Sequence, residues 1–263
     1  MSDLQEFNRT DLFSIEGKVA LVTGGSRGIG LMIAKAYVAN GAKVYISSRK
    51  AEVCEAVAAE LSKYGECIAL PADLADDNGR KDFVNALATA ESQLHILVNN
   101  AGAAWGAPLS EYPEAGYDKV MDINVRTPFF LTRDLLPLLE AAGTAEDPAR
   151  IINIGSIDGL HVSHVDNFSY GPSKAAIHHM TKVFAVELGP KHMTVNAIAP
   201  GPFVSKMTEW LLDEHGENIK RRNPLGRIGS ETDMGGLALF LASKAGAYMN
   251  GTIIPLDGGM HYR

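Results

Sequence analysis

Short apolar runs rich in β-branched residues alternate with longer segments of helical character along the whole chain. Most of these runs are apolar throughout, which is typical of strands that are covered on both faces. The alternation therefore predicts a parallel sheet with helices on both sides. The expected strands are Lys18–Thr23, Lys43–Ser48, Cys67–Pro71, Ile96–Asn99, Arg150–Ile154, Thr194–Ala199 and Thr252–Leu256.

Helical segments lie between the expected strands, and we expect one α/β domain with a doubly wound, seven-stranded parallel sheet of the Rossmann type. The expected helices are Ile29–Ala39, Lys50–Lys63, Gly79–Ala90, Tyr117–Leu139, Tyr170–Leu188 and Thr232–Ala242. This domain covers residues 15–263 after an extension of residues 1–14. Residues 201–223 form the least regular stretch and are expected to be a lid, whereas residues 143–149 indicate a plain surface turn.

The composition and net charge of the chain exclude several classes of protein. The chain is 46% hydrophobic and 21% charged, which is typical of a soluble globular protein. A net charge of −7 argues against a nucleic-acid binder, and we found no apolar stretch long enough for a membrane span. The two cysteines, Cys54 and Cys67, are too few for a disulfide framework. We therefore expect a cytoplasmic protein.

The stretch "TGGSRGIG", residues 23–30, follows the first expected strand and opens the first long helix. Glycines allow a ligand to approach the backbone, and a helix N-terminus offers free N–H groups to a phosphate. The spacing of Gly24, Gly28 and Gly30 departs from the usual dinucleotide pattern, and no P-loop lysine follows. Taken alone, the motif is also compatible with tight packing at a turn.

The residue type at the end of the second strand indicates whether such a domain binds NAD or NADP. An acidic residue there suits the ribose hydroxyl of NAD, whereas a basic residue suits the additional phosphate of NADP. The sequence is "YISSRK", with Ser48 followed by Arg49 and Lys50, and Arg27 lies in the glycine loop. A guanidinium pairs well with phosphate oxygens, so the sequence favours NADP(H). The alternative is that Arg49 and Lys50 only begin a solvated helix.

Tyr170 and Lys174 lie four residues apart in "SYGPSKAA", so a helix would place them on one face. A neighbouring ammonium lowers the pKa of a tyrosine, which suits proton transfer to or from an alcohol oxygen. Ser156 follows the fifth strand, where its hydroxyl can bind a carbonyl oxygen. Taken separately, the pair is compatible with a surface position and the serine with a turn.

The order of the motifs resembles the short-chain dehydrogenase/reductase family over about residues 15–260. The motifs are "TGGSRGIG", "NNAG" at 99–102, Asn124 in "MDINV", Ser156, "YGPSK" at 170–174 and "APG" at 199–201. Within the family the chain is most similar to NADPH-dependent 3-oxoacyl reductases, in particular the rhamnolipid-associated type. The resemblance implies hydride transfer between NADP(H) and a ketone or secondary alcohol, with Asn124, Ser156, Tyr170 and Lys174 as the catalytic residues.

The resemblance also implies roles in cofactor binding. Gly24, Ser26, Arg27, Ile29 and Gly30 would line the phosphates and ribose, and Ser48 and Arg49 would bind the 2′-phosphate. Asp73 and Leu74 would flank the adenine, and Asn99, Ala101 and Gly102 would support the adenosine ribose side. Lys174, beside Tyr170, would bind the nicotinamide ribose, and Pro200, Gly201 and Ser205 would contact the nicotinamide. Ser205 departs from the threonine of many members but keeps a hydroxyl.

Each of these residues also has a structural alternative. Asp73 can cap a helix, Asn99 and Asn124 can satisfy buried backbone groups, and Pro200 with Gly201 can form a simple turn.

Apolar side chains in residues 103–109, 159–168 and 203–212 predict the substrate pocket, although any of them can instead belong to the core or an interface. The expected pocket residues are Trp105, Phe168, Phe203, Met207, Trp210 and Leu211. Such a pocket suits an acyl chain or another hydrophobic ketone. His161 and His164 lack an evident third ligand, so no metal site is expected.

Other functions remain open from the residues alone. A general carbonyl reductase or secondary alcohol dehydrogenase would use the same catalytic residues. Ser173 in "GPSKA", with Asp257 and His261, has the order of a serine hydrolase triad, although this serine falls in a helix. A non-catalytic NADP-binding regulator would share the fold. The family resemblance further implies a homo-oligomer, a dimer or tetramer built on Tyr117–Leu139, Tyr170–Leu188 and the C-terminal strand region.

Overall fold

The computed structural model describes residues 8–162, 165–205 and 209–262. Its seven strands form one parallel sheet in the order β3-β2-β1-β4-β5-β6-β7. The predicted doubly wound α/β fold is confirmed. The strands are β1 (Val19–Thr23), β2 (Lys43–Ser47), β3 (Cys67–Ala69), β4 (Ile96–Asn99), β5 (Ala149–Ile154), β6 (Met193–Pro200) and β7 (Ile253–Leu256).

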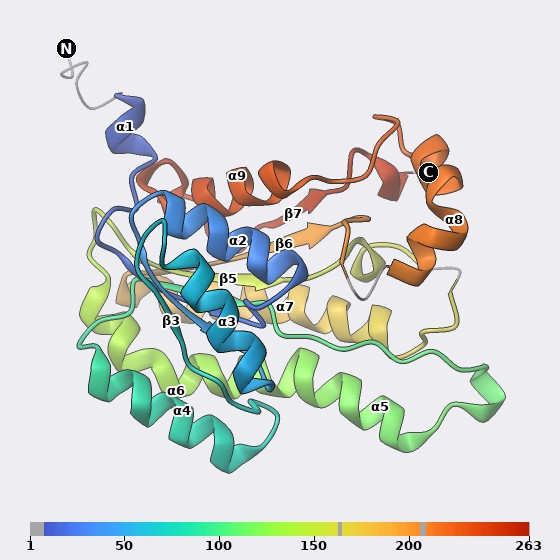
Figure 1. Cartoon of the computed structure of the whole chain (residues 1–263), viewed down its shortest axis with the longest axis horizontal. Coiled ribbons are helices and arrows are strands. Elements are labelled where there is room, and N and C mark those ends of the chain that lie inside the picture. The colour runs from blue at the N-terminus through green and yellow to red at the C-terminus, as the bar shows by residue number, and fades with distance from the viewer. Residues whose placement is uncertain (1–7, 163–164, 206–208, 263) are drawn as a thin grey trace.

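Helices cover both faces of the sheet (Figure 1). One hydrophobic core joins α2, α3 and α9 to the sheet, and a second core joins α4, α6 and α7 to its other face. The helices are α1 (Arg9–Leu12), α2 (Gly28–Ala39), α3 (Ala51–Leu61), α4 (Asp77–Ala90), α5 (Glu114–Met121), α6 (Thr127–Ala142), α7 (Tyr170–Leu188), α8 (Glu209–Arg222) and α9 (Glu231–Ala242). No helix in the described ranges has the length and apolar character needed to cross a bilayer.

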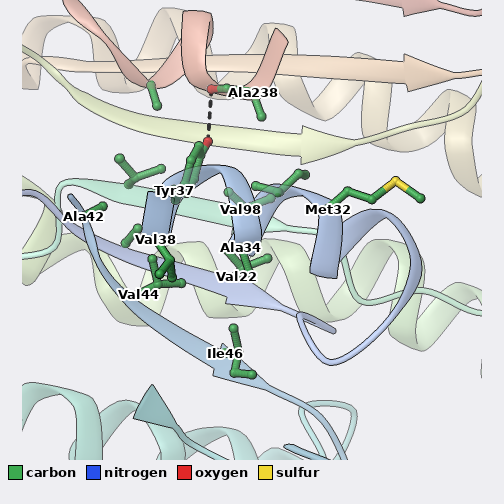
Figure 2. Packing of buried hydrophobic residues seen from close by; sticks show 14 of the residues in the cluster. Val22, Met32, Ala34, Tyr37, Val38, Ala42, Val44, Ile46, Val98 and Ala238 are labelled. Carbon is green, nitrogen blue, oxygen red and sulfur yellow. Dashed lines mark hydrogen bonds between the residues drawn. The ribbon is translucent and has the colours of Figure 1, made fainter. Parts of the chain in front are cut away.

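The close packing of α2 against α9 anchors the helix that follows the glycine loop. The hydroxyl of Tyr37 is fully buried and donates a hydrogen bond to the carbonyl oxygen of Ala238 at 3.1 Å (Figure 2). A Cβ on Gly235 would lie 2.9 Å from the Cβ of Ala36, so a larger residue would force the helices apart. This contact fixes α2 against the sheet.

Two segments differ from the sequence-based expectations. The helix expected at Tyr117–Leu139 is two helices, α5 and α6, joined by a π-helical turn at Asp122–Arg126. Residues 201–223 were expected to be irregular, but α8 occupies most of that segment. Its sequence has a central glycine and few apolar residues, which hid the helical period.

Residues 143–149 are not a plain surface turn, because Asp147 joins two cations across the chain. Lys18 binds its carboxylate at 2.8 Å, and Arg150 binds it at 2.9 Å. Arg150 is only 1% exposed and also donates to the carbonyl oxygens of Pro148 and Ser243. Burial alone would raise the pKa of Asp147, but the hydrogen bond and charge of Lys18 together with Arg150 lower it. The sequence interpretation of this turn was therefore wrong.

Replacing Asp147 by Asn should lower the free energy of unfolding by about 1 to 3 kcal/mol at pH 7, because Arg150 would keep a buried charge without its counter-ion. The lowered pKa means that the ionised carboxylate stabilises the fold above its unfolded pKa of about 4. The difference from wild type should therefore shrink as the pH falls below that value. Urea unfolding at pH 7 and at a pH below about 4 measures the difference in free energy of unfolding between Asp147→Asn and wild type. The exposed neighbour Glu146, changed to Gln, is the control. Equal stability of Asp147→Asn and wild type at pH 7 would contradict the assignment.

Candidate active site

The carboxyl ends of the parallel strands lie along one edge of the sheet, so the loops that follow them meet there. β1 pairs with β2 on one side and with β4 on the other, which makes the boundary between β1 and β4 the point where the strand order reverses. Open α/β sheets bind ligands at this reversal. The glycine loop follows β1, and residues 99–102 end β4 and follow it.

The glycines of the loop are required largely by the protein's own packing. Gly24 and Gly28 have φ angles of +66° and +53°, which disfavour any side chain. A Cβ on Gly30 would lie 2.5 Å from the carbonyl oxygen of Gly24 and 2.4 Å from the side-chain amide nitrogen of Asn100. A Cβ on Gly25 would lie 2.7 Å from Ile46. The loop is thus folded tightly onto β2 and β4.

Asn100 holds the glycine loop in place, and the sequence analysis did not select it. Its side-chain amide donates to the carbonyl oxygens of Thr23 at 2.8 Å and Gly24 at 3.3 Å. The hydroxyl of Thr23 accepts from the backbone N–H groups of Asn100 and Ala101. The second asparagine of "NNAG" was the available signal. Asn99, which was selected, instead binds Thr132 and Asn153 within the buried interior.

The N-terminus of α2 is suited to an anion. Arg27 is the N-cap residue and makes no capping hydrogen bond through its side chain. The first N–H groups of an α-helix have no partner within the helix itself and therefore suit an anion. Arg27 is exposed beside them, Ser26 is buried in the loop, and Ile29 is partly buried. Ser205 lies next to the loop, since a Cβ on Gly28 would be 3.1 Å from its Cβ.

The residues expected at the adenosine end follow β2 and β3. Ser48 is partly buried and its hydroxyl donates to the carbonyl oxygen of Lys50, while Arg49 is exposed. Arg49 forms no ion pair with another residue in the described part of the chain. Asp73 is exposed and accepts from the N–H of Ala75, and Leu74 is buried. A cation without an acidic neighbour at this position suits a phosphate.

Ser156 begins a short 3-10 turn, Ile157–Gly159, directly after β5. Its hydroxyl accepts from the backbone N–H of Asp158 at 3.1 Å and hydrogen-bonds the side chain of Tyr170. The turn packs closely on α7, because a Cβ on Gly159 would lie 2.8 Å from the backbone nitrogen of Ala175. The predicted partners Ser156 and Tyr170 are therefore brought together by a contact between a turn and a helix.

Tyr170 and Lys174 lie on one face of the first turn of α7, with the Lys174 ammonium 5.5 Å from the tyrosine ring centre. The ammonium donates to the carbonyl oxygen of Ile154 at the end of β5 at 2.8 Å. Burial raises the pKa of Tyr170 to about 12, and burial lowers the pKa of Lys174 to about 8. The pKa of Tyr170 therefore lies above its ordinary value and not below it, because burial disfavours the phenolate. The lowering effect expected of Lys174 itself stays a prediction.

Asn124 lies in the π-helical turn between α5 and α6, a distortion that is frequent at functional sites. Its amide oxygen accepts from the N–H of Ala103, and its amide nitrogen donates to Ala103 and to Ser173. A Cβ on Gly102 would lie 3.2 Å from this oxygen and 3.7 Å from the Lys174 ammonium. Asn124 and Lys174 therefore both lie close to Gly102, which the resemblance had assigned to the adenosine ribose side.

The loop after β6 begins at the same edge of the sheet as the other loops of the site. Pro200 ends β6 and is buried, and Gly201 donates its N–H to the carbonyl oxygen of Leu256. A Cβ on Gly201 would lie 2.6 Å from that of Asp257, so the backbone passes very close to the C-terminal segment there. Pro200, Gly201 and Ser205 follow the strand edge that carries the site, and their nicotinamide contacts stay a prediction.

The structure places the residues expected to line the substrate pocket in different surroundings. Phe203 is only 2% exposed and its ring packs on Gly229, so it belongs to the buried core, and its place in the pocket stays a prediction. Trp105 is partly exposed and packs against Gly116 of α5, and Phe168 is exposed with its ring against that of Tyr112. Trp105 and Phe168 stay predictions. Met207 lies outside the described residues, and for Trp210 and Leu211 the structure describes only the backbone of α8.

The hydrolase alternative is excluded by the position of its nucleophile. Ser173 is fully buried inside α7, and its hydroxyl donates to the carbonyl oxygen of Tyr170. Asp257 and His261 do pair at 2.7 Å, but Ser173 has no exposed hydroxyl for attack on a substrate. Within the described ranges, no group of His, Cys, Asp and Glu side chains could hold a metal ion, and His164 lies outside them.

Known proteins share this sequence and fold over nearly the whole chain. A family profile described as Enoyl-(Acyl carrier protein) reductase matches residues 24–261. The rhamnolipids biosynthesis 3-oxoacyl-(acyl-carrier-protein) reductase of Pseudomonas aeruginosa is 48% identical over 251 residues, covering 95% of this chain and 98% of that protein. Gluconate 5-dehydrogenase of Gluconobacter oxydans is 33% identical over 253 residues, covering 95% and 97%.

Solved structures agree with these sequence matches. The Pseudomonas aeruginosa RhlG/NADP active-site complex matches with a TM-score of 0.92 at 48% identity, covering 95% of this chain and 98% of that one. With the ordered glycine loop, Ser156, Tyr170 and Lys174 at the same strand edge, these matches establish that the chain belongs to the short-chain dehydrogenase/reductase family of oxidoreductases.

Proposed function

We propose that this protein is an NADP(H)-dependent reductase of a hydrophobic ketone, most specifically the ketone of a 3-oxoacyl thioester. The observation that carries the proposal is the meeting of Ser156, Tyr170 and Lys174 at the same edge of the sheet as the glycine loop and the N-terminus of α2. The 48% identity to a 3-oxoacyl reductase over 95% of the chain supports the substrate class.

The residues at the adenosine end fit NADP(H). The uncapped α2 terminus and the close glycine backbone suit the pyrophosphate, with Arg27 beside them. Ser48 and Arg49 stand where an acid would be needed to bind the 2′-hydroxyl of NAD. The match to an NADP complex of a relative supports the same choice.

The protonated Tyr170 and the hydroxyl of Ser156 would both donate hydrogen bonds to the substrate's carbonyl oxygen. When bound, NADPH supplies the hydride that reduces the carbonyl carbon. Tyr170 delivers its proton to the oxygen as negative charge develops there, and Ser156 stabilises that charge. The overall reaction consumes one ketone, one NADPH and one proton, and yields one alcohol and one NADP⁺.

Lys174 would hold positive charge next to Tyr170 while the tyrosine gives up its proton. Its pKa of about 8 keeps it mostly charged at neutral pH, and its bond to Ile154 fixes the ammonium at the end of β5. Asn124 would support this arrangement from the π-helical turn, through its contacts with Ala103 and Ser173.

We further propose that the protein works as a cytoplasmic homo-oligomer. The two helices expected at the interface expose apolar side chains, namely Phe129 on α6 and Val183 and Val186 on α7, the last 80% exposed. Both described cysteines are free and buried, in keeping with a reducing compartment.

Purified protein should oxidise NADPH rapidly with a medium-chain 3-oxoacyl thioester, because the apolar side chains around the site suit an acyl chain. Loss of absorbance at the reduced-nicotinamide band measures this. A cyclic ketone tests the runner-up, a general carbonyl reductase, and a keto-gluconate tests the activity named in the gluconate relative. An enoyl thioester tests reduction of a carbon–carbon double bond. Turnover only with one of these three would move the protein out of the 3-oxoacyl class.

The control for this assay is Tyr170→Phe, which removes the proton donor without changing the ring. It should lower kcat/KM by at least about a hundredfold while NADPH binding, followed by fluorescence, stays unchanged. A variant with the wild-type rate would refute the catalytic assignment. NADPH binding without turnover of any carbonyl by the wild type would indicate a non-catalytic regulator.

Replacing Arg49 by Ala should weaken NADPH binding about tenfold or more and leave NADH binding unchanged, because only NADPH carries the 2′-phosphate. Fluorescence titration of both cofactors measures the effect. Lys63→Ala is the matched control, since Lys63 is an exposed cation beyond the far end of α3. An equal loss of affinity for both cofactors would show that Arg49 does not select the phosphate.

Sedimentation velocity should show an assembly larger than the 28.2 kDa chain. Val186→Glu should shift it toward the monomer, because a charge would enter the buried apolar interface. Arg221→Glu on the exposed end of α8 should leave the assembly intact. A monomeric wild type would refute the oligomer proposal.

A further inference from the structure

A carboxylate that the reaction does not consume lies beside the catalytic pair. Asp158 occupies the 3-10 turn Ile157–Gly159, two residues after Ser156, and its backbone N–H donates to the Ser156 hydroxyl at 3.1 Å. Its side chain is 21% exposed and hydrogen-bonds the side chain of Asn167. A carboxylate in such a partly desolvated place acts strongly on neighbouring ionisable groups.

The backbone holds Asp158 against the first turn of α7. A Cβ on Gly171, the residue after Tyr170, would lie 3.1 Å from the carbonyl oxygen of Asp158. A Cβ on Gly159 would lie 2.8 Å from the backbone of Lys174 and Ala175. These two close approaches show that the turn lies directly against the first turn of α7. The backbone of Asp158 is therefore adjacent to Tyr170 and Gly171.

Charged and titratable groups face this region from two elements, the loop after the turn and α7. From the loop after the turn, the ring nitrogen of His161 lies 3.9 Å from the Asp158 carboxylate. From α7, the Lys174 ammonium lies 5.5 Å from the Tyr170 ring centre. His178, also on α7, packs under Gly155 and Gly159, and burial lowers its pKa to about 4, so it is neutral at neutral pH.

Among the described residues, Asp158 is the acid whose charge acts on Tyr170. Burial has the largest effect on the pKa of Tyr170, and the negative charge of Asp158 raises it further. The hydrogen bond from Ser156 acts in the opposite direction. A negative neighbour favours the neutral phenol over the phenolate, which is the form that donates a proton.

We propose that Asp158 is a positioning residue that holds Tyr170 in its protonated form, so that the enzyme continues to reduce carbonyls at a more alkaline pH than it would without this carboxylate. The kinetic part of this proposal rests on the proposed function. The effect on Tyr170 itself does not, because it concerns a proton equilibrium between two side chains of the chain.

The first test is a titration of Tyr170 in protein whose tyrosines are replaced by difluorotyrosine. This phenol is more acidic than tyrosine, so its titration falls where the protein remains folded. Fluorine NMR follows each ring, and Tyr170→Phe identifies the Tyr170 signal among the eight tyrosines. Asp158→Asn should raise the phenolate fraction about threefold to tenfold at a fixed pH below the midpoint. An unchanged or lower fraction would overturn the proposal.

Two further variants control the titration. Asp166→Asn removes an exposed acid from the same loop and should leave the Tyr170 midpoint where it is in wild type. Asp158→Ala removes the same charge without a side-chain amide and should give the same displacement as Asp158→Asn. If Asp166→Asn shifts the Tyr170 midpoint as much as Asp158→Asn does, the effect is a general one of charge, and the specific role of Asp158 is refuted.

The second test is the alkaline limb of kcat/KM for carbonyl reduction. In Asp158→Asn this limb should begin at a lower pH than in wild type, while the rate near neutral pH remains within about threefold. A limb that does not move would overturn the kinetic part of the proposal. Absence of turnover with every carbonyl tested would refute the proposed function alone, since the fluorine titration would still report the action of Asp158 on Tyr170.

Discussion

The side-chain amide of Asn100 binds the carbonyl oxygens of Thr23 and Gly24, and the rest of the site depends on this contact. It joins the end of β4 to the end of β1, the two strands between which the order of the sheet reverses. Gly24 and Gly30 both pack closely against the side-chain amide of Asn100, which fixes the position of the glycine loop. This contact sets the position of the α2 N-terminus, where we propose that the cofactor phosphates bind, relative to the residues that follow β4.

Desolvation is the second factor that determines the chemistry. Burial makes Tyr170 a weaker acid and Lys174 a weaker base than either is in water, which leaves Tyr170 with its proton at neutral pH. A protonated tyrosine beside Ser156 suits delivery of a proton to a reduced carbonyl. The same burial allows a single carboxylate, Asp158, to influence the proton equilibrium from a neighbouring turn.

The sequence predicted the sheet well because buried parallel strands are short and apolar throughout, and all seven expected strands are present within a few residues. It predicted α8 poorly, since a polar helix containing Gly216 shows little apolar periodicity. The continuous helix expected at 117–139 was wrong because no local signal marks the π-helical turn that brings Asn124 inward. Asp147 looked like part of a surface turn because two partners of its cluster are distant in sequence: Lys18, which binds its carboxylate, and the carbonyl oxygen of Ser243, which accepts from Arg150.

The sequence by itself determined the order of the elements and pointed to the residues proposed to react, because strand pattern, glycine spacing and the four-residue interval from Tyr170 to Lys174 are local properties. Only the tertiary structure decided how those groups behave. Phe203 is buried in the core, and Asn100, not Asn99, binds the glycine loop. The pKa of Tyr170 is raised and not lowered. Burial and long-range contacts arise only when distant segments pack together, so no local pattern records them.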